Sequence, residues 1–431
     1  MERKIKVLVI TYTSWRNDTN VGNSYSNIFN GMDDRLEFAQ LYIRDGMPEN
    51  NMVHKYFYIS EKKLLKSVFT RRPVGEYFYL EDPMNTTKVV FSKSYNKMRK
   101  LNWEIFFLAR DIACSLGVWK SKKLDKFLED FRPDIIFSHF GSVTTVNQLI
   151  TYCQNKTGAR LVLYPWDDLY HINQYNKSAA YRLRVHLERH FMRKCAEPCS
   201  FMYTITEKMA NEFMVIFNKE CKILRKGYEF LKKPDIKQTN TKEISLVYTG
   251  NIGDKRWTVL AEIAKSIQKV SEMTDKRLHL YIYTLSAIDD EMRKALEIEN
   301  ISSLMGAISS QEVPKVLEKA DILIHVEAFD KAKLETCRSS FSTKLVDYFF
   351  QGKCILAVGG QNSSMEYLKD NDAAIVVDDV EKIDEAIERI ALNPEIINEY
   401  GLKAWACGER NHNIHDIQDM IYEDFKSLVE R

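Results

Sequence analysis

Short apolar runs alternate along the chain with longer segments in which apolar residues recur at three- and four-residue spacing. This alternation is typical of parallel β-sheets covered by helices, so it predicts an α/β fold. The predicted strands of the first half are residues 5–11, 36–43, 134–140, 160–166 and 201–206. Those of the second half are residues 244–250, 278–284, 321–327, 354–359 and 373–377.

A polar stretch separates the two sets of strands. Residues 232–242 are rich in Lys, Thr and other polar residues and offer almost nothing to bury, as expected for a linker. We therefore expect two doubly wound, Rossmann-like domains with parallel sheets, one over residues 1–232 and one over residues 243–408. The last segment, residues 409–431, carries apolar residues at helical spacing and predicts a terminal helix.

Composition narrows the class of protein. The chain has 431 residues, of which 45% are hydrophobic, so it can bury large cores and is not a disordered chain. Its formal net charge of +2 does not favour a dedicated nucleic-acid binder. The apolar runs are all shorter than the roughly 18–20 residues of a membrane span, and the eight cysteines are scattered without zinc-site spacing. We expect a cytoplasmic protein.

Positive charge is concentrated in one region. Residues 61–126 contain 15 Lys or Arg and 7 Asp or Glu, interleaved with aliphatic and aromatic side chains. This pattern predicts contact with an anionic membrane surface or an anionic acceptor, and hence peripheral association with the inner face of the membrane. An ordinary solvated helix face is the alternative.

A glycine-containing loop joins the predicted strand 244–250 to the next helix. Gly250 and Gly253 let the backbone approach an anion at the helix start, and Lys255 and Arg256 add positive charge there. The spacing matches neither the dinucleotide fingerprint nor the Walker pattern, which argues against dehydrogenases and P-loop proteins.

A second helix start carries complementary groups. Ser342 and Thr343 precede an apolar stripe, Lys344 adds a cation, and Asp347 lies one turn further on. This helix start suits the binding of a diphosphate, and Asp347 could accept hydrogen bonds from two ribose hydroxyls. The alternative is that Ser342 only caps the helix and Asp347 is a solvated surface acid.

These motifs together resemble the donor domain of the glycosyltransferase family 4 group. The segments that carry the resemblance are residues 248–256, 306–308, 321–327 and 342–353, with weaker similarity at 131–139 and 202–209. The resemblance implies the GT-B fold, in which two Rossmann-like domains face each other across a cleft and the terminal helix rejoins the first domain. It also implies retaining transfer of a sugar from a nucleotide donor, with no cofactor and no obligatory metal.

The resemblance implies donor-binding roles at specific positions. The basic residues would neutralise the diphosphate, the helix start at Ser342 would lie beneath it, and Asp347 would bind the ribose. The donor-binding residues of the second domain are Gly250, Lys255, Arg256, Gly306, Ile308, Arg338, Ser342, Thr343, Lys344 and Asp347. In the first domain, Gly22 and Asn23 fall at the family's glycine-containing loop, which faces donor phosphate and acceptor.

One departure from the family pattern affects the sugar side of the site. The family often has a Glu eight residues before its ribose-binding acid, whereas this chain has Ser339. Glu327, Glu335 or Arg338 would then replace that contact. We expect His139, Arg256 and Glu327 to be the catalytic residues, although a lone His after a strand is also a common core residue.

Further polar residues follow the predicted strand 160–166. Asp168 is an expected acceptor-side contact, with capping of a turn as its alternative. No Asp-x-Asp pair stands where a metal–diphosphate site would need it, so no metal site is predicted.

The leading hypothesis is a glycosyltransferase that uses a nucleotide-sugar donor and a saccharide or lipid-linked saccharide acceptor in surface polysaccharide biosynthesis. Two alternatives stay open: a sugar-nucleotide epimerase of the same fold, and a non-catalytic nucleotide-sugar-binding scaffold. An epimerase needs acid and base groups on both sides of a sugar carbon, and a scaffold would tolerate the missing Glu.

Overall fold

The computed structural model describes residues 3–17, 20–80, 104–171, 178–234 and 242–430. The chain divides into two compact units: residues 1–225 with 416–431, and residues 226–415. The sequence analysis placed the domains at 1–232 and 243–408, so residues 226–232 and 409–415 pack with the second unit. The predicted linker lies mostly outside the described residues.

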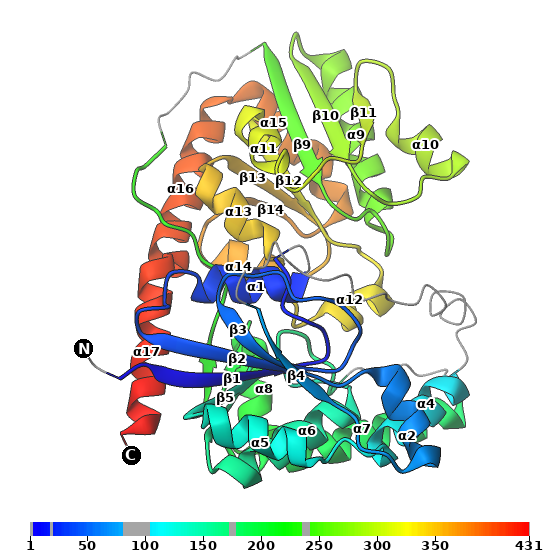
Figure 1. The fold of residues 1–431 in the computed structure, drawn as a ribbon. Helices are drawn as coiled ribbons and strands as arrows, with labels where there is room; N and C mark the ends of the chain where they lie inside the picture. Colours follow the sequence, from blue (N-terminus) through cyan, green and yellow to red (C-terminus); the bar gives the residue numbers. More distant parts are fainter. Residues whose placement is uncertain (1–2, 18–19, 81–103, 172–177, 235–241, 431) are drawn as a thin grey trace. The chain divides into compact units, whose positions relative to one another are not determined.

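Unit 1 is built on a sheet whose strands run in the order β4-β3-β2-β1-β5-β6-β7-β8. Strands β1 to β5 of this sheet are labelled in Figure 1. Only the edge pair β3–β4 is antiparallel within the sheet. The strands are β1 Ile5–Thr11, β2 Leu36–Tyr42, β3 Val53–Tyr58, β4 Glu76–Tyr79, β5 Ile135–Ser138, β6 Arg160–Leu163, β7 Cys199–Thr204 and β8 Cys221–Ile223. Their helices are α1 Asn20–Phe29, α2 Glu61–Thr70, α4 Glu104–Leu116, α5 Lys122–Phe131, α6 Thr144–Thr157, α7 Ala179–Ala196, α8 Glu207–Phe217 and α17 Ile414–Val429.

The aromatic core of unit 1 includes the end of the chain. Phe137 of β5 lies at its centre, with ring-centre distances of 5.3 Å to Phe29 and 6.0 Å to Phe425. Ile417, Ile421 and Phe425 of α17 are buried in the same cluster. The last helix therefore completes the core of the first unit.

Unit 2 is a wholly parallel sheet in the order β11-β10-β9-β12-β13-β14. Its strands are β9 Glu243–Thr249, β10 Arg277–Tyr283, β11 Ser302–Gly306, β12 Ile322–Val326, β13 Cys354–Val358 and β14 Ile375–Val377. Its helices are α9 Arg256–Met273, α10 Asp290–Leu296, α11 Val313–Lys319, α12 Lys331–Cys337, α13 Lys344–Gln351, α14 Ser363–Asp370, α15 Ile383–Leu392 and α16 Glu395–His412, with a short 3₁₀ turn at Val380–Lys382.

The predicted α/β class with two doubly wound parallel sheets is confirmed. All ten predicted strands exist, and the pattern missed the edge or near-edge strands β3, β4, β8 and β11. Among the described residues, no helix is both long and apolar enough to cross a membrane.

Candidate functional site

The order of strands in unit 2 reverses between β9 and β12. Connections from β9 run outward through β10 and β11, whereas those from β12 run through β13 and β14. Parallel α/β sheets bind ligands beyond the carboxyl ends of the strands at such a reversal point. Gly250 directly follows β9 and Glu327 directly follows β12, so both lie where the fold favours a ligand.

The loop after β9 approaches a lysine closely. Gly250 has φ +146°, and a Cβ added there would collide with Nζ of Lys344. Asp254 and Lys255 both have positive φ, and α9 then begins at Arg256 without a side-chain cap among the described residues. The backbone N–H groups of Arg256, Trp257 and Thr258 already donate to carbonyl oxygens of the loop. What this helix start offers to an anion is therefore the side-chain charge of Lys255 and Arg256.

Lys344, the first residue of α13, places its ammonium group next to this loop. Its Nζ donates to the carbonyl oxygen of Thr249 at 2.9 Å and lies 4.9 Å from the ring centre of Tyr248. Burial, together with the neighbouring Arg256 charge, lowers the pKa of Lys344 to about 8. The ammonium is therefore less stable here than in water, and an anion beside it would stabilise it.

Arg256 forms an ion pair with Glu327, at 3.0 Å between Nη2 and Oε2. Glu327 is buried, and its other carboxylate oxygen lies 3.6 Å from Nε2 of His325. Burial lowers the pKa of His325 to about 4, so the imidazole is neutral at neutral pH. An entering diphosphate would therefore either compete with Glu327 for the guanidinium of Arg256 or bind beside the existing ion pair.

The start of α13 is the second anion-binding position that the sequence predicts. Thr343 is exposed and no described side chain caps the helix start, so the alternative in which Ser342 is a simple cap is wrong. The backbone N–H of Ser342 donates to Oγ of Ser364 at 2.9 Å.

Asp347 is engaged by two residues from the beginning of unit 2. Nζ of Lys226 and the hydroxyl of Tyr228 both lie 2.5 Å from its Oδ1. The ring of Tyr228 stacks on Phe350 at 4.5 Å between ring centres, and burial, followed by the charge of Asp347, raises the pKa of its hydroxyl. Asp347 is therefore held in place and is not a freely solvated acid.

The other expected donor residues lie around this group. Lys255 is exposed, with Nζ 3.6 Å from the carboxylate of Asp330. Gly306 ends the edge strand β11 with φ +76°, and Ile308 follows it. Arg338 follows α12, and its carbonyl oxygen accepts from Oγ of Ser363 at 3.0 Å.

The predicted residues of the first half lie in unit 1. His139 follows β5, stacks on Trp166 at 3.9 Å, and has Nδ1 3.3 Å from the carbonyl oxygen of Tyr164. Burial lowers its pKa to about 4, which makes it a neutral hydrogen-bonding group at neutral pH. The expectation that Gly22 and Asn23 lie in a loop is wrong. They lie in α1, where Gly22 packs against the backbone of Arg16 so closely that a side chain would not fit.

No family model matches the chain, and no curated protein matches it. Solved structures match over nearly its whole length. TarM from S. aureus, in complex with fondaparinux, α-GlcNAc-glycerol and UDP, is 12% identical with a TM-score of 0.59, covering 98% of this chain and 99% of that one. WaaG, a glycosyltransferase involved in lipopolysaccharide biosynthesis, is 11% identical with a TM-score of 0.55 over 98% and 99%. The α,α-trehalose 6-phosphate synthase of Burkholderia multivorans is 9% identical with a TM-score of 0.60 over 99% and 98%. This chain has the GT-B fold.

Within this GT-B chain, Gly250, Arg256, Glu327 and Lys344 lie close together, and their roles in donor binding stay predictions. The sequence analysis missed the partners of two predicted residues. Tyr228 and Lys226 on Asp347, and Trp166 under His139, lie in segments with no catalytic motif of their own. Membership of family 4 within the GT-B enzymes stays a prediction.

Proposed function

We propose that the chain is a glycosyltransferase that moves a sugar from a nucleotide-sugar donor to a saccharide or lipid-linked saccharide acceptor. The observation that carries the proposal is the convergence of Arg256 and Lys344 at the strand-reversal point of unit 2, where Lys344 opens α13 and no described side chain caps that helix. The complex of TarM with UDP and the role of WaaG in lipopolysaccharide biosynthesis support a UDP-sugar donor and a surface glycan product.

In the proposed reaction, side-chain cations take the place of a metal ion in neutralising the diphosphate. Cleaving the sugar–phosphate bond develops negative charge on the diphosphate, and Arg256 and Lys344 would bind that charge more tightly in the transition state than in the ground state. Asp347 would accept hydrogen bonds from the ribose, with retention at the anomeric carbon as in the resembling family. Transfer would proceed in the presence of EDTA.

Calorimetric titration with UDP, GDP and ADP in EDTA tests the donor site. We expect one nucleotide to bind, and Arg256→Ala and Asp347→Ala to weaken its binding by about 1–3 kcal/mol each. Arg277→Ala is the matched control. Arg277 lies at the amino end of β10, whereas the proposed site lies beyond the carboxyl ends of the strands, and its side chain is 84% exposed. If no nucleotide binds, or if the two site variants bind like the control, the donor-site assignment is wrong.

We also propose that unit 1 contacts an anionic membrane through α2 and α4, which pack against each other. Phe69 of α2 is 89% exposed, Ile105 of α4 is 62% exposed, and Lys62 and Lys66 are exposed on α2. Residues 81–103 of the predicted basic region lie outside the described residues.

Co-sedimentation with vesicles tests this contact. Wild-type protein should pellet with phosphatidylglycerol vesicles and much less with phosphatidylcholine vesicles, because the basic side chains attract anionic lipid. Phe69→Ser should reduce pelleting, whereas Val215→Ser, which changes an equally exposed side chain of α8, should not. Equal loss in both variants would contradict a surface specific to α2 and α4.

A further inference from the structure

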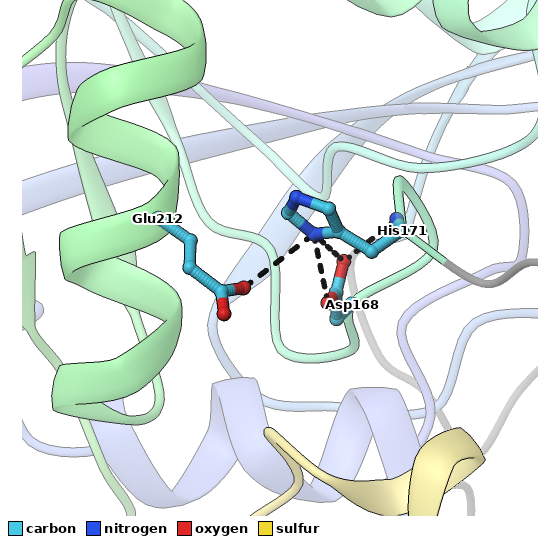
Figure 2. A group of neighbouring side chains, drawn as sticks. All are labelled: Asp168, His171 and Glu212. Carbon is cyan, nitrogen blue, oxygen red and sulfur yellow. Dashed lines mark hydrogen bonds and ion pairs between the residues drawn. The ribbon is translucent and has the colours of Figure 1, made fainter.

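Three side chains with metal-binding groups meet in unit 1, outside the proposed donor site. Asp168 lies in the turn after β6, His171 lies three residues later, and Glu212 projects from α8 (Figure 2). Their ligand atoms all lie within 4.8 Å of one another. The first two belong to one turn and the third to a separate helix, so the fold and not local sequence brings them together.

The short distances between these side chains all involve one atom, Nδ1 of His171. Nδ1 of His171 lies 2.9 Å from both carboxylate oxygens of Asp168 and 3.5 Å from Oε2 of Glu212. A nitrogen carries at most one proton, so it cannot make full hydrogen bonds to both carboxylates. Ligand atoms about 2.0–2.2 Å from one ion, at angles of roughly 90–110°, lie about 2.9–3.5 Å apart, and the separations from Nδ1 of His171 fall in this range.

The surrounding residues hold this arrangement in place. The Asp168 side chain is 8% exposed, and one of its oxygens accepts from the backbone N–H of His171 at 3.0 Å. The His171 ring packs edge-on against Tyr170, with 5.6 Å between ring centres. Tyr170 is itself fixed, because Nε of Arg189 donates to its carbonyl oxygen at 2.8 Å. Outer contacts of this kind orient the first ligands of metal sites.

We propose that Asp168, His171 and Glu212 bind one divalent transition-metal ion and thereby tie the turn after β6 to α8. One imidazole and two carboxylates suit zinc, manganese or cobalt, whereas calcium and magnesium favour sites made wholly of oxygen ligands. This proposed role differs from the acceptor contact expected for Asp168 and from the expectation of no metal site, both of which stay predictions. It does not depend on the proposed glycosyl transfer, whose donor-site cations Arg256 and Lys344 lie in unit 2.

Metal binding to the full chain tests the proposal. The protein is stripped with EDTA, exchanged into metal-free buffer and titrated with zinc chloride by calorimetry, and bound zinc is counted by elemental analysis after gel filtration. We expect one equivalent to bind and the thermal midpoint to rise, since an ion that binds only the folded state stabilises it. Glu212→Gln should weaken binding by at least about tenfold, and His171→Ala should abolish the stoichiometric site.

His415→Ala is the matched control. His415 also contacts a carboxylate, with Nε2 3.0 Å from Glu229, but this exposed pair belongs to no three-ligand group among the described residues. Its loss should leave zinc binding unchanged. If His171→Ala does not fold by circular dichroism, Glu212→Gln decides, because Glu212 is an accessible residue on a helix. Zinc binding that is absent in the wild type, or equal in wild type and Glu212→Gln, would overturn the proposal.

Discussion

Lys344 is the buried cation of the proposed donor site, and burial makes its charge sensitive to pH. Its pKa is lowered to about 8, so the ammonium loses its proton just above neutral pH. A bound diphosphate favours the charged form. We therefore expect the affinity for the preferred nucleoside diphosphate to fall between about pH 7 and about pH 9, as measured by calorimetry across that range.

The variant Lys344→Met provides the comparison for this pH dependence. It should bind weakly and with little change over the same range, because the titrating group is gone. The stability of the nucleotide-free protein should change in the opposite direction as the pH rises. The unfolded chain keeps this lysine protonated up to about pH 10.4, so between about pH 8 and that value the group makes stability rise with pH. A wild-type affinity that stays constant up to about pH 9 would show that Lys344 does not contact the anion.

Single residues at strand ends and helix starts were the predictable part of the site. Gly250 and Lys344 follow from local pattern, because a strand end, a glycine and a helix start can all be recognised in a short segment. The partners of Asp347 could not be predicted in this way. Lys226 lies 121 residues and Tyr228 119 residues from it along the chain, and only packing of unit 2 joins them.

The loop between β9 and α9 is the element that brings backbone and cation together. Gly250→Ala would place a Cβ against Nζ of Lys344, which is the flexible end of a side chain and can move away. The clash should therefore reduce mainly nucleotide affinity, because the ammonium would lose its position at Thr249. We expect nucleotide affinity to fall at least about tenfold, the cost of one charge-assisted hydrogen bond, as measured by calorimetry.

Gly158→Ala separates this effect from simple backbone strain. Gly158 ends α6 with φ +69°, and an added Cβ there would meet no atom within 4 Å. Both variants should lower the free energy of unfolding by about 1 kcal/mol, because alanine disfavours positive φ. Only Gly250→Ala should also lose nucleotide affinity. Equal affinity in the two variants would contradict the role given to the loop.

For the strands too, burial explains which ones the hydrophobic pattern of the sequence predicted. Central strands such as β5 and β12 are buried throughout and consist mostly of apolar residues, which makes them recognisable in the sequence. The missed strand β4 is largely exposed, β8 has only three residues, and β11 includes two serines and a terminal glycine. Such edge strands are defined by pairing with a neighbour, which a hydrophobicity pattern does not contain.

On the scale of the whole molecule, chain order and compact units do not coincide. Unit 1 uses the first 225 residues and the last 16, while unit 2 is the continuous segment between them. Composition and strand spacing predicted two α/β units, because each set of apolar runs is enough for one sheet. The placement of the last helix rested on the family resemblance, because an amphipathic helix fits many apolar surfaces.

The dependence of unit 1 on the end of the chain leads to a final prediction. Phe425 of α17 is fully buried in the core of unit 1, so Phe425→Ala should lower the free energy of unfolding of that unit by about 3–5 kcal/mol. Val429→Ala, on the same helix at a side chain that is 40% exposed, should cost much less. Urea unfolding followed by circular dichroism measures both values. If the two substitutions cost the same, α17 is only an appendage of unit 1 and contributes little to its core.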